Sequence, residues 1–459
     1  MDWNDRELLA NAAGMALSYA GSVDDRPTTP SQAALDALAA FDEPLTESGR
    51  DAEETLRLLA DVGGPATVAS TGGRYFGFVT GATYPVALGS AWLAAAWDQN
   101  AALPVMSPIA ARLHEVVRGW LVALLRLPAD TGLAFVTGAT VANAACLAAA
   151  RDALLARMGW DVQADGLFGA PPLPVVIGER AHSTLAKSLG LVGLGRTRVH
   201  VVPADDQGRL RAERLPDVAG PVLVCAQAGE VNTGAFDPFD AVADWLAERG
   251  GWLHVDGAFG LWAMADPSRA HLVAGLERAD SWATDGHKWL NVGYDCGLAF
   301  VRDLADLRRT FTAAAAYLPA GAEFEAMHHT PQSSQRARQI EVWAVLRTLG
   351  RDGVAELVTR TCAAARTIAD GLAAGGLTVL NDVVLNQVLV RLDDGPTTEA
   401  LVAAVQADGR VWCGPGVWGG VAAMRISVSS WKTGGAEAAL AVEAILECAA
   451  QARKSASRT

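Results

Sequence analysis

The sequence is poor in lysine and lacks any cluster of positive charge. Of its 37 basic residues, only Lys187, Lys288, Lys432 and Lys454 are lysines, and the formal net charge is −14. Nucleic-acid binding needs clustered Lys and Arg to contact phosphates, so we expect no nucleic-acid partner. The six cysteines lie singly, without a CxxC or metal-like spacing, so we expect no metal site. Buried free thiols in a reducing cytoplasm explain such cysteines best.

Long charge-free stretches are few, and two of them need attention. Residues 75–97 and 131–150 exceed the length of a membrane span, but Pro85, Asn143 and repeated Thr and Gly interrupt them. We expect each to form a buried strand, a glycine turn and an Ala-rich helix, with no membrane role. The acidic start, MDWNDRELLA, lacks the basic-then-apolar order of a secretion signal, so we expect a cytoplasmic protein.

The 459 residues allow two or three domains and a large core. The pattern predicts helices first, over residues 6–20, 31–41 and 48–62. This helical arm would pack on a neighbouring subunit or cover its own chain. Short apolar runs separated by helices then predict a buried, mainly parallel sheet, with strands over residues 133–136, 175–177, 199–202, 222–225, 252–255 and 298–301. A second α/β unit follows, with helices over 335–349, 354–372 and 436–449 and strands over 386–391 and 423–428.

Three features follow strands of this sheet, where ligands of parallel sheets bind. Gly138-Ala139-Thr140 opens a helix and could cradle a phosphate, although such a turn also serves packing. Asp256 leaves an apolar strand and needs a cation, which a protonated ring nitrogen or an arginine would supply, unless it caps a helix. Lys288 follows a strand-like run in a chain where arginine is preferred. An amine can attack a carbonyl and a guanidinium cannot, so Lys288 is either a Schiff-base lysine or a surface residue.

The order of these features resembles the pyridoxal-phosphate enzymes of the aspartate-aminotransferase fold, specifically the group II amino-acid decarboxylases, which include the aromatic L-amino-acid decarboxylases. Residues 75–85 resemble the family's FFGF…TGxxYP segment, residues 229–238 its GTTNTGAFDP segment, and 287–289 its HKW signature. The resemblance covers most of the chain. The resemblance implies an α/β fold of fold type I: an N-terminal helical arm (1–70), a large domain (71–318) with a mainly parallel seven-stranded sheet, and a small C-terminal α/β domain (319–459). It also implies a homodimer.

The resemblance further implies pyridoxal 5'-phosphate as cofactor and assigns roles to single residues. Lys288 would form the Schiff base, Asp256 would pair with the pyridine nitrogen, and His182 would stack over the ring. The other implied cofactor contacts are Gly138, Ala139, Thr140, Asn232, Ala258, Asp285 and His287, and the implied substrate contacts are Phe78, Val79, Thr80 and Arg425. A core role for His182, a loop-supporting role for His287 and a structural ion pair for Arg425 remain open.

The sequence also departs from the family pattern. Glu230 and Val231 replace threonines, Asp285-Gly286 stands where Asn-Pro or Asp-Pro is usual, and Val141 replaces a glutamate. These changes weaken any inference about the substrate. The resemblance favours decarboxylation of an L-amino acid, an aromatic one being one option, to the amine and CO2. Oxidative aldehyde formation, transamination, carbon–carbon lyase chemistry and a non-catalytic role are the alternatives.

The stretch 317–334 corresponds to a loop that closes over the site in the aromatic decarboxylases. There a loop tyrosine protonates the carbanion, and relatives with phenylalanine form aldehydes. Here Tyr317 precedes the loop and no tyrosine follows within it. His328 and His329 titrate near neutrality, so either could deliver that proton, unless both are solvated loop residues.

Overall fold

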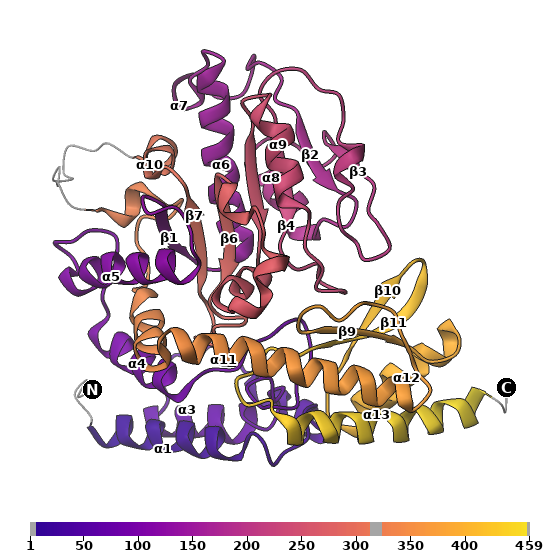
Figure 1. Ribbon diagram of the computed structural model, residues 1–459. Coiled ribbons are helices and arrows are strands. Elements are labelled where there is room, and N and C mark those ends of the chain that lie inside the picture. Colours follow the sequence, from indigo (N-terminus) through magenta and orange to yellow (C-terminus); the bar gives the residue numbers. More distant parts are fainter. Residues whose placement is uncertain (1–5, 313–323, 457–459) are drawn as a thin grey trace. The chain divides into compact units, whose positions relative to one another are not determined.

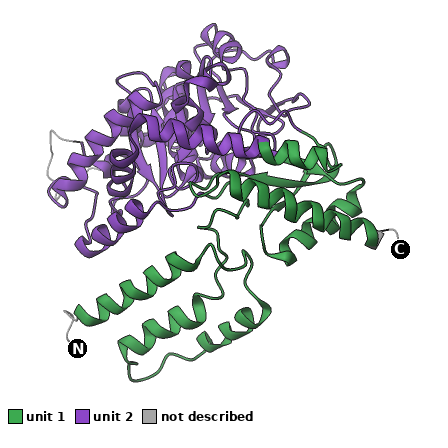
Figure 2. Ribbon diagram, turned by 60° about the horizontal axis from the view of Figure 1, so that its bottom comes forward, with its two compact units in different colours: residues 1–80, 367–380, 389–459 green, residues 81–366, 381–388 purple. Residues whose placement is uncertain are grey.

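The protein is described by a computed structural model over residues 6–312 and 324–456. The chain divides into two compact units that interleave along the sequence (Figure 2). Unit 1 comprises residues 1–80, 367–380 and 389–459, and unit 2 comprises residues 81–366 and 381–388. The division into arm, large and small domains at residues 70 and 318 stays a prediction.

Unit 2 contains a seven-stranded sheet in the order β1-β7-β6-β5-β4-β2-β3 (Figure 1). The pairs β2–β3, β2–β4, β4–β5 and β5–β6 are parallel, while β7 runs antiparallel to both β1 and β6. The mainly parallel sheet is therefore confirmed. Its strands are β1 (Gly132–Val136), β2 (Val175–Gly178), β3 (His200–Val202), β4 (Leu223–Gln227), β5 (Trp252–Asp256), β6 (Ser281–Asp285) and β7 (Gly297–Val301).

Every strand except β7 runs in one direction, so six carboxyl ends meet at one edge of the sheet, where β7 begins. Register shows this directly, because Gly297 at the start of β7 lies opposite both Val136 of β1 and Asp285 of β6. The glycine turn after β1, Asp256 and the Lys288 segment consequently share this edge.

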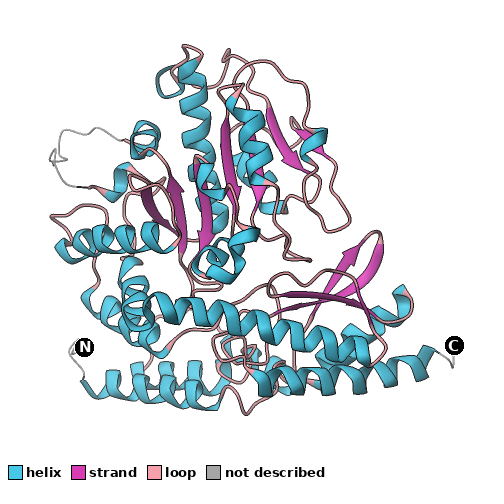
Figure 3. Cartoon of the chain, in the orientation of Figure 1, coloured by secondary structure: helices cyan, strands magenta, loops and turns pink. Residues whose placement is uncertain are grey.

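The helices of unit 2 are α4 (Pro85–Trp97), α5 (Pro108–Leu124), α6 (Ala139–Arg157), α7 (Val162–Asp165), α8 (Ser183–Leu191), α9 (Phe239–Ala247) and α10 (Leu304–Phe311). Helix α6 runs alongside the strands and packs on β5, β6, β7, α8 and α10 (Figure 3). Alternate strand residues such as Val136, Cys225 and Ala283 join its alanines in one buried cluster. By length and composition α6 could cross a membrane, but 78% of its apolar window is buried inside the protein, as in a core helix.

Three short 3-10 helices follow β5, at Gly260–Ala265, Pro267–Leu272 and Leu276–Arg278. Helix α11 (Gln339–Ala374) begins in unit 2 and ends in unit 1. It is interrupted at Gly350, whose φ of 63° and ψ of −171° are not helical. The two helices predicted over 335–349 and 354–372 are the two halves on either side of this kink.

One element of the sequence prediction is wrong. No strand forms at the start of residues 75–97: Tyr75 makes only an isolated bridge to Trp412, and α4 follows at Pro85. The reason is local, because Phe78 and Val79 adopt φ values of 54° and 57°. This left-handed conformation is incompatible with an extended strand.

Unit 1 contains a four-stranded sheet, β10-β11-β9-β8, with α12 and α13 packed together beside it. Its N-terminal helices contribute no buried residue, and Leu9, Leu17 and Leu59 are more than half exposed. The elements are α1 (Arg6–Ser22), α2 (Gln32–Ala37), α3 (Ala52–Leu58), β8 (Thr378–Val379), β9 (Gln387–Arg391), α12 (Gly395–Asp408), β10 (Gly414–Trp418), β11 (Val421–Ser427) and α13 (Gly435–Ala456).

Candidate active site at the strand ends of unit 2

The turn between β1 and α6 is held by the end of β6. The Ala139 amide, in the first turn of α6, donates to Asp285 Oδ1 at 2.6 Å, and the Thr140 carbonyl accepts from Ser188 Oγ at 2.9 Å. A side chain at Gly138 would place Cβ 3.2 Å from His287 Cε1, so glycine leaves room there. The start of a 19-residue helix carries partial positive charge and favours an anion. This turn therefore fits a phosphate group.

Asp285 joins three predicted cofactor contacts. Besides Ala139, its carboxylate lies 3.3 Å from Lys288 Nζ and 3.6 Å from His287 Nε2. Burial lowers the pKa of His287, so its ring is neutral at pH 7. The His287 Nδ1 accepts from the Cys296 amide, which leaves the Nε2 proton facing Asp285. The lysine, the imidazole and the phosphate turn thus converge on one buried carboxylate.

The backbone after Lys288 is fixed by residues 81–84. A Cβ at Gly81 would come within 1.8 Å of the Lys288 carbonyl oxygen, so only glycine fits this contact. Asn291, in the left-handed region with φ 57°, accepts from the Ala82 amide at 2.8 Å and donates to the Trp289 carbonyl at 2.6 Å. Asparagine tolerates this conformation better than most residues. The TGxxYP-like segment therefore packs on the lysine loop.

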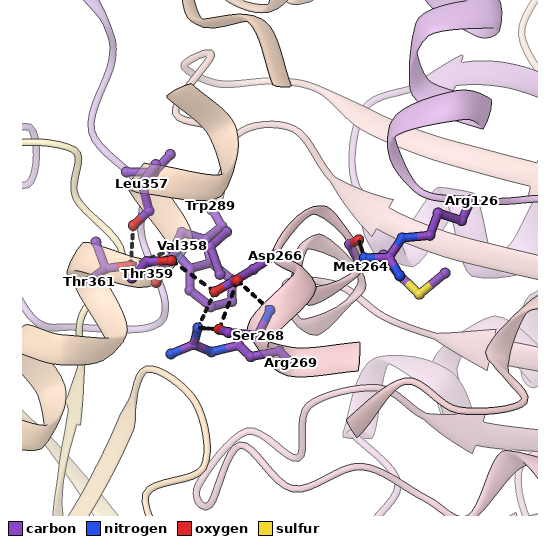
Figure 4. A network of polar contacts seen from close by, with 10 residues as sticks. All are labelled: Arg126, Met264, Asp266, Ser268, Arg269, Trp289, Leu357, Val358, Thr359 and Thr361. Carbon is purple, nitrogen blue, oxygen red and sulfur yellow. Dashed lines mark hydrogen bonds and ion pairs between the residues drawn. The ribbon is translucent and has the colours of Figure 1, made fainter. Parts of the chain in front are cut away.

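Trp289 is anchored on its other side by α11 (Figure 4). Its indole nitrogen donates to Thr361 Oγ1 at 2.9 Å, and the ring is 1% exposed. Two residues earlier on α11, Thr359 Oγ1 donates to Asp266 at 2.9 Å, and Asp266 also pairs with Arg269. The bond to Thr361 therefore anchors the residue next to Lys288, the tryptophan of the HKW signature, on α11.

Asp256 is a buried carboxylate that has hydrogen-bond donors but no cation. It is 6% exposed, Asn143 Nδ2 donates to Oδ2 at 3.0 Å, and the Ala258 amide donates to Oδ1 at 3.2 Å. Within residues 6–312 and 324–456, no Lys, Arg or His lies within ion-pair distance of it. Burying an unpaired charge is costly, so a protonated ring nitrogen would fit the chemistry of this site.

Asn143 is not among the site residues that the sequence predicts, where it stands out only as a polar residue that disfavours a membrane span. It is fully buried one turn into α6, and its side chain lies between Asp256 and His254. The available signal was a lone amide within an otherwise apolar, Ala-rich helix.

Two other predicted cofactor contacts, His182 and Asn232, form hydrogen bonds with residues of their own turns. His182 caps the N-terminus of α8, and its Nδ1 lies 2.7 Å from Thr184 Oγ1. The Asn232 amide donates to Glu230 at 2.9 Å, and Glu230 also accepts from the backbone amides of Asn232 and Thr233. The glutamate that departs from the family pattern is thus a turn-stabilising residue. The predicted cofactor contacts of His182 and Asn232 stay predictions.

The predicted proton donors are buried rather than solvated. His328 Nε2 lies 3.2 Å from Glu325 Oε2, and His329 Nδ1 lies 2.8 Å from the Glu325 carbonyl. His329 stacks on Phe324, which in turn stacks on His114. Burial lowers the pKa of His329 to about 4. Tyr317 and the loop up to residue 323 lie outside the described residues.

The predicted substrate contacts belong to unit 1. Phe78 is 62% exposed, with its ring centroid 5.3 Å from that of Trp412, whereas Val79 and Thr80 are buried. Arg425 lies on β11 opposite Gly414. Their contact with a substrate stays a prediction.

Comparison with known proteins decides the family. Residues 66–392 match the model described as the pyridoxal-dependent decarboxylase conserved domain. The chain belongs to this family. Its cofactor is pyridoxal phosphate. This agrees with three features at one edge of the sheet: the buried Asp256 without a cation, the turn that fits an anion, and Lys288.

Curated relatives carry different substrate names. Mouse acidic amino acid decarboxylase GADL1 is 30% identical over 279 residues, covering 58% of this chain and 50% of that protein. L-2,4-diaminobutyrate decarboxylase of Rhizobium meliloti is 33% identical, covering 58% and 52%. Tryptophan decarboxylase 1 of Oryza sativa subsp. japonica is 28% identical, covering 80% and 75%. The matched segment spans about half the length of the first relatives.

Solved structures share the fold over nearly the whole chain. The structure of Oryza sativa TDC with PLP and tryptamine superposes with a TM-score of 0.91 at 23% identity, covering 98% of this chain and 99% of that one. The structure of Rhodiola rosea 4-hydroxyphenylacetaldehyde synthase gives 0.86 at 20% identity, covering 98% and 99%. The predicted fold type I architecture is confirmed.

Proposed function

We propose that this protein is an amino-acid α-decarboxylase that converts an L-amino acid to the amine and CO2, with the cofactor attached to Lys288. The observation that carries the proposal is the buried Asp256 carboxylate, without a cation, on the same sheet edge as Lys288 and the anion-binding turn. Family membership supports the same reading.

Each residue would have a distinct task. The turn at Ala139 would bind the phosphate, Asp256 would hold a proton on the ring nitrogen, and Lys288 Nζ would supply the attacking amine. Pyridoxal phosphate supplies an electron sink for negative charge at the substrate α-carbon. Asp285, 3.3 Å from Lys288 Nζ, would hold this amine at the strand end. His287, neutral and bonded to the Cys296 amide, would orient Asp285.

For the substrate we propose only an L-amino acid, without choosing a single side-chain class. The named relatives act on acidic amino acids, tryptophan and diaminobutyrate, and Trp289 with Tyr294-Asp295-Cys296 resembles the aromatic branch. An aromatic L-amino acid is therefore one candidate among several. The test is a product panel: the purified protein, supplied with cofactor, is incubated with acidic, aromatic and basic amino acids. Release of CO2 with one amine supports the proposal, and a keto acid as the main product would contradict it.

Oxidative aldehyde formation is the second candidate. It is favoured by one observation, the lack of tyrosine in residues 318–334, where the resemblance expects the proton-donating tyrosine of a decarboxylase. In the same panel this activity would consume oxygen and yield aldehyde, peroxide and ammonia in place of the amine.

We also propose that the protein is a homodimer in the cytoplasm. Helices α1 and α3 bury no residue within the chain, and Leu9 and Leu17 of α1 and Leu59, directly after α3, are exposed, which supports an intersubunit role for the arm. All six cysteines are buried and free, which supports a reducing compartment. Sedimentation at low micromolar concentration should show a dimer, and a fully active monomer would contradict the proposal.

A further inference from the structure

Five buried side chains form a continuous chain of hydrogen bonds that ends on Asp256. Trp252 Nε1 donates to Ser281 Oγ at 2.9 Å, and Ser281 Oγ lies 2.9 Å from His254 Nδ1. His254 Nε2 lies 2.9 Å from Asn143 Oδ1, and Asn143 Nδ2 donates to Asp256 Oδ2 at 3.0 Å. The three middle members, Ser281, His254 and Asn143, are all 0% exposed.

The two ends of this chain fix the direction of every bond. A carboxylate only accepts, so Asn143 must donate its NH2 to Asp256 and accept through Oδ1. His254 must therefore carry its proton on Nε2. The indole of Trp252 only donates, so Ser281 accepts from it and is left to donate its hydroxyl proton to His254 Nδ1. All donors point toward Asp256, and neutral His254 satisfies each atom. Burial lowers the pKa of His254 to about 4, which agrees with a neutral ring.

The backbone explains why these residues meet. Trp252, His254 and Asp256 alternate along β5 and so share the face that packs on α6, from which Asn143 projects. Cys225, Ala283 and other apolar side chains surround them. Polar groups in such a core cost free energy unless they are satisfied, and a directed chain strengthens its last bond.

We propose that His254 and Asn143 are positioning residues for the cofactor: their directed hydrogen bond keeps Asp256 charged and so holds the proton on the ring nitrogen. Without the donor at Oδ2, the carboxylate would bind a proton more tightly, and the ring nitrogen would compete less well for it. Cofactor affinity would fall with the strength of the Asp256–ring pair. The inference rests on the cofactor-binding part of the proposed function and is independent of which product forms.

The two nitrogens of His254 can be tested separately. In His254→Gln the amide nitrogen lies as many bonds from Cβ as Nε2 does, so it can still donate to Asn143. In His254→Asn the amide lies at the level of Nδ1 and cannot reach Asn143. Both variants remove the ring, so the glutamine variant is the matched control for lost packing. Affinity is measured by titrating the cofactor-free full-length chain with pyridoxal phosphate, and the 15N shift of ring-labelled cofactor reports protonation of the ring nitrogen.

We expect His254→Gln to bind the cofactor within about threefold of the unaltered protein. His254→Asn should bind it about tenfold or more weakly, because Asn143 is then no longer held with its NH2 toward Asp256 and this charge-assisted hydrogen bond is weakened. The 15N shift should move toward the unprotonated value in His254→Asn alone. Equal affinities and shifts in both variants would overturn the proposal.

A second variant guards against misfolding. Asn143→Ala fits the Ala-rich helix α6 and removes the side chain that donates to Asp256. Combined with His254→Asn, it should weaken binding no more than Asn143→Ala alone, because both act through one hydrogen bond. Additive losses would show that the two residues act separately and would also overturn the proposal. Since the readout is cofactor binding, a product other than the amine would contradict the proposed reaction without affecting this test.

Discussion

Gly297→Ala should damage the cofactor site through the backbone alone. Gly297 begins β7 between Val136 and Asp285, and a Cβ there would lie 2.5 Å from both Cα and the carbonyl carbon of Gly138. These are backbone atoms of the turn between β1 and α6, which is predicted to bind the phosphate, and they cannot rotate away. Overpacking of this kind costs about 1–3 kcal/mol. Moving the turn would also strain the bond from the Ala139 amide to Asp285.

The assay compares urea melts and pyridoxal-phosphate titrations of Gly297→Ala with those of Gly119→Ala. Gly119 lies within α5, and nothing stands within 4 Å of a Cβ built on it. The control should be unchanged or more stable by about 0.5–1 kcal/mol, because alanine favours a helix interior. Gly297→Ala should lose about 1–3 kcal/mol of stability and about tenfold in cofactor affinity. If it melted and bound cofactor like the unaltered protein, the packing of β7 on the turn would not control the site.

Three further predictions concern Asn291, His254, and the pair His328 and His329. Asn291→Ala should destabilise the protein by about 1–3 kcal/mol in urea melts, because the left-handed backbone and two buried hydrogen bonds depend on the amide; an unchanged midpoint would refute this. Burial lowers the pKa of His254 to about 4 in the folded protein, against 6.5 when unfolded. Between pH 6.5 and 4 the unfolded chain therefore binds a proton that the folded chain does not, so about 3 kcal/mol of folding stability is lost as pH falls through this range. His254→Gln should lose less stability than the unaltered protein between pH 6.5 and 4. Parallel stability–pH profiles of the two proteins would contradict the lowered pKa of His254. Replacing His328 and His329 together should lower amine formation more than cofactor binding, and normal turnover in the double variant would place the proton donor elsewhere.

The sequence located the strand ends well because apolar runs and turn residues are local signals. The runs at 133–136 and 252–255 form β1 and β5, each one residue longer than predicted, and the kink at Gly350 falls between two predicted helices. The strand predicted at the start of residues 75–97 is wrong for a local reason too. The left-handed backbone of Phe78 and Val79 excludes a strand, and an aromatic run does not predict that conformation.

The support behind Asp256 could not be predicted. Asn143 and Asp256 are 113 residues apart, and their contact depends on which side of α6 faces β5. His254 looked like one more buried strand residue. Only the packed sheet shows that Trp252 and His254, alternate residues of β5, lie on the same face as Asp256 and connect to it by hydrogen bonds.

The central claim is that Lys288 carries the cofactor, and reductive labelling tests it most directly. The holoenzyme is treated with borohydride, digested, and the modified peptide is sequenced by mass spectrometry. Lys288, 3.3 Å from Asp285 at the common edge of the sheet, should hold the reduced pyridoxyl group, and visible absorbance of the bound cofactor should disappear with it. A label on Lys187, or bound cofactor without any labelled lysine, would contradict the account.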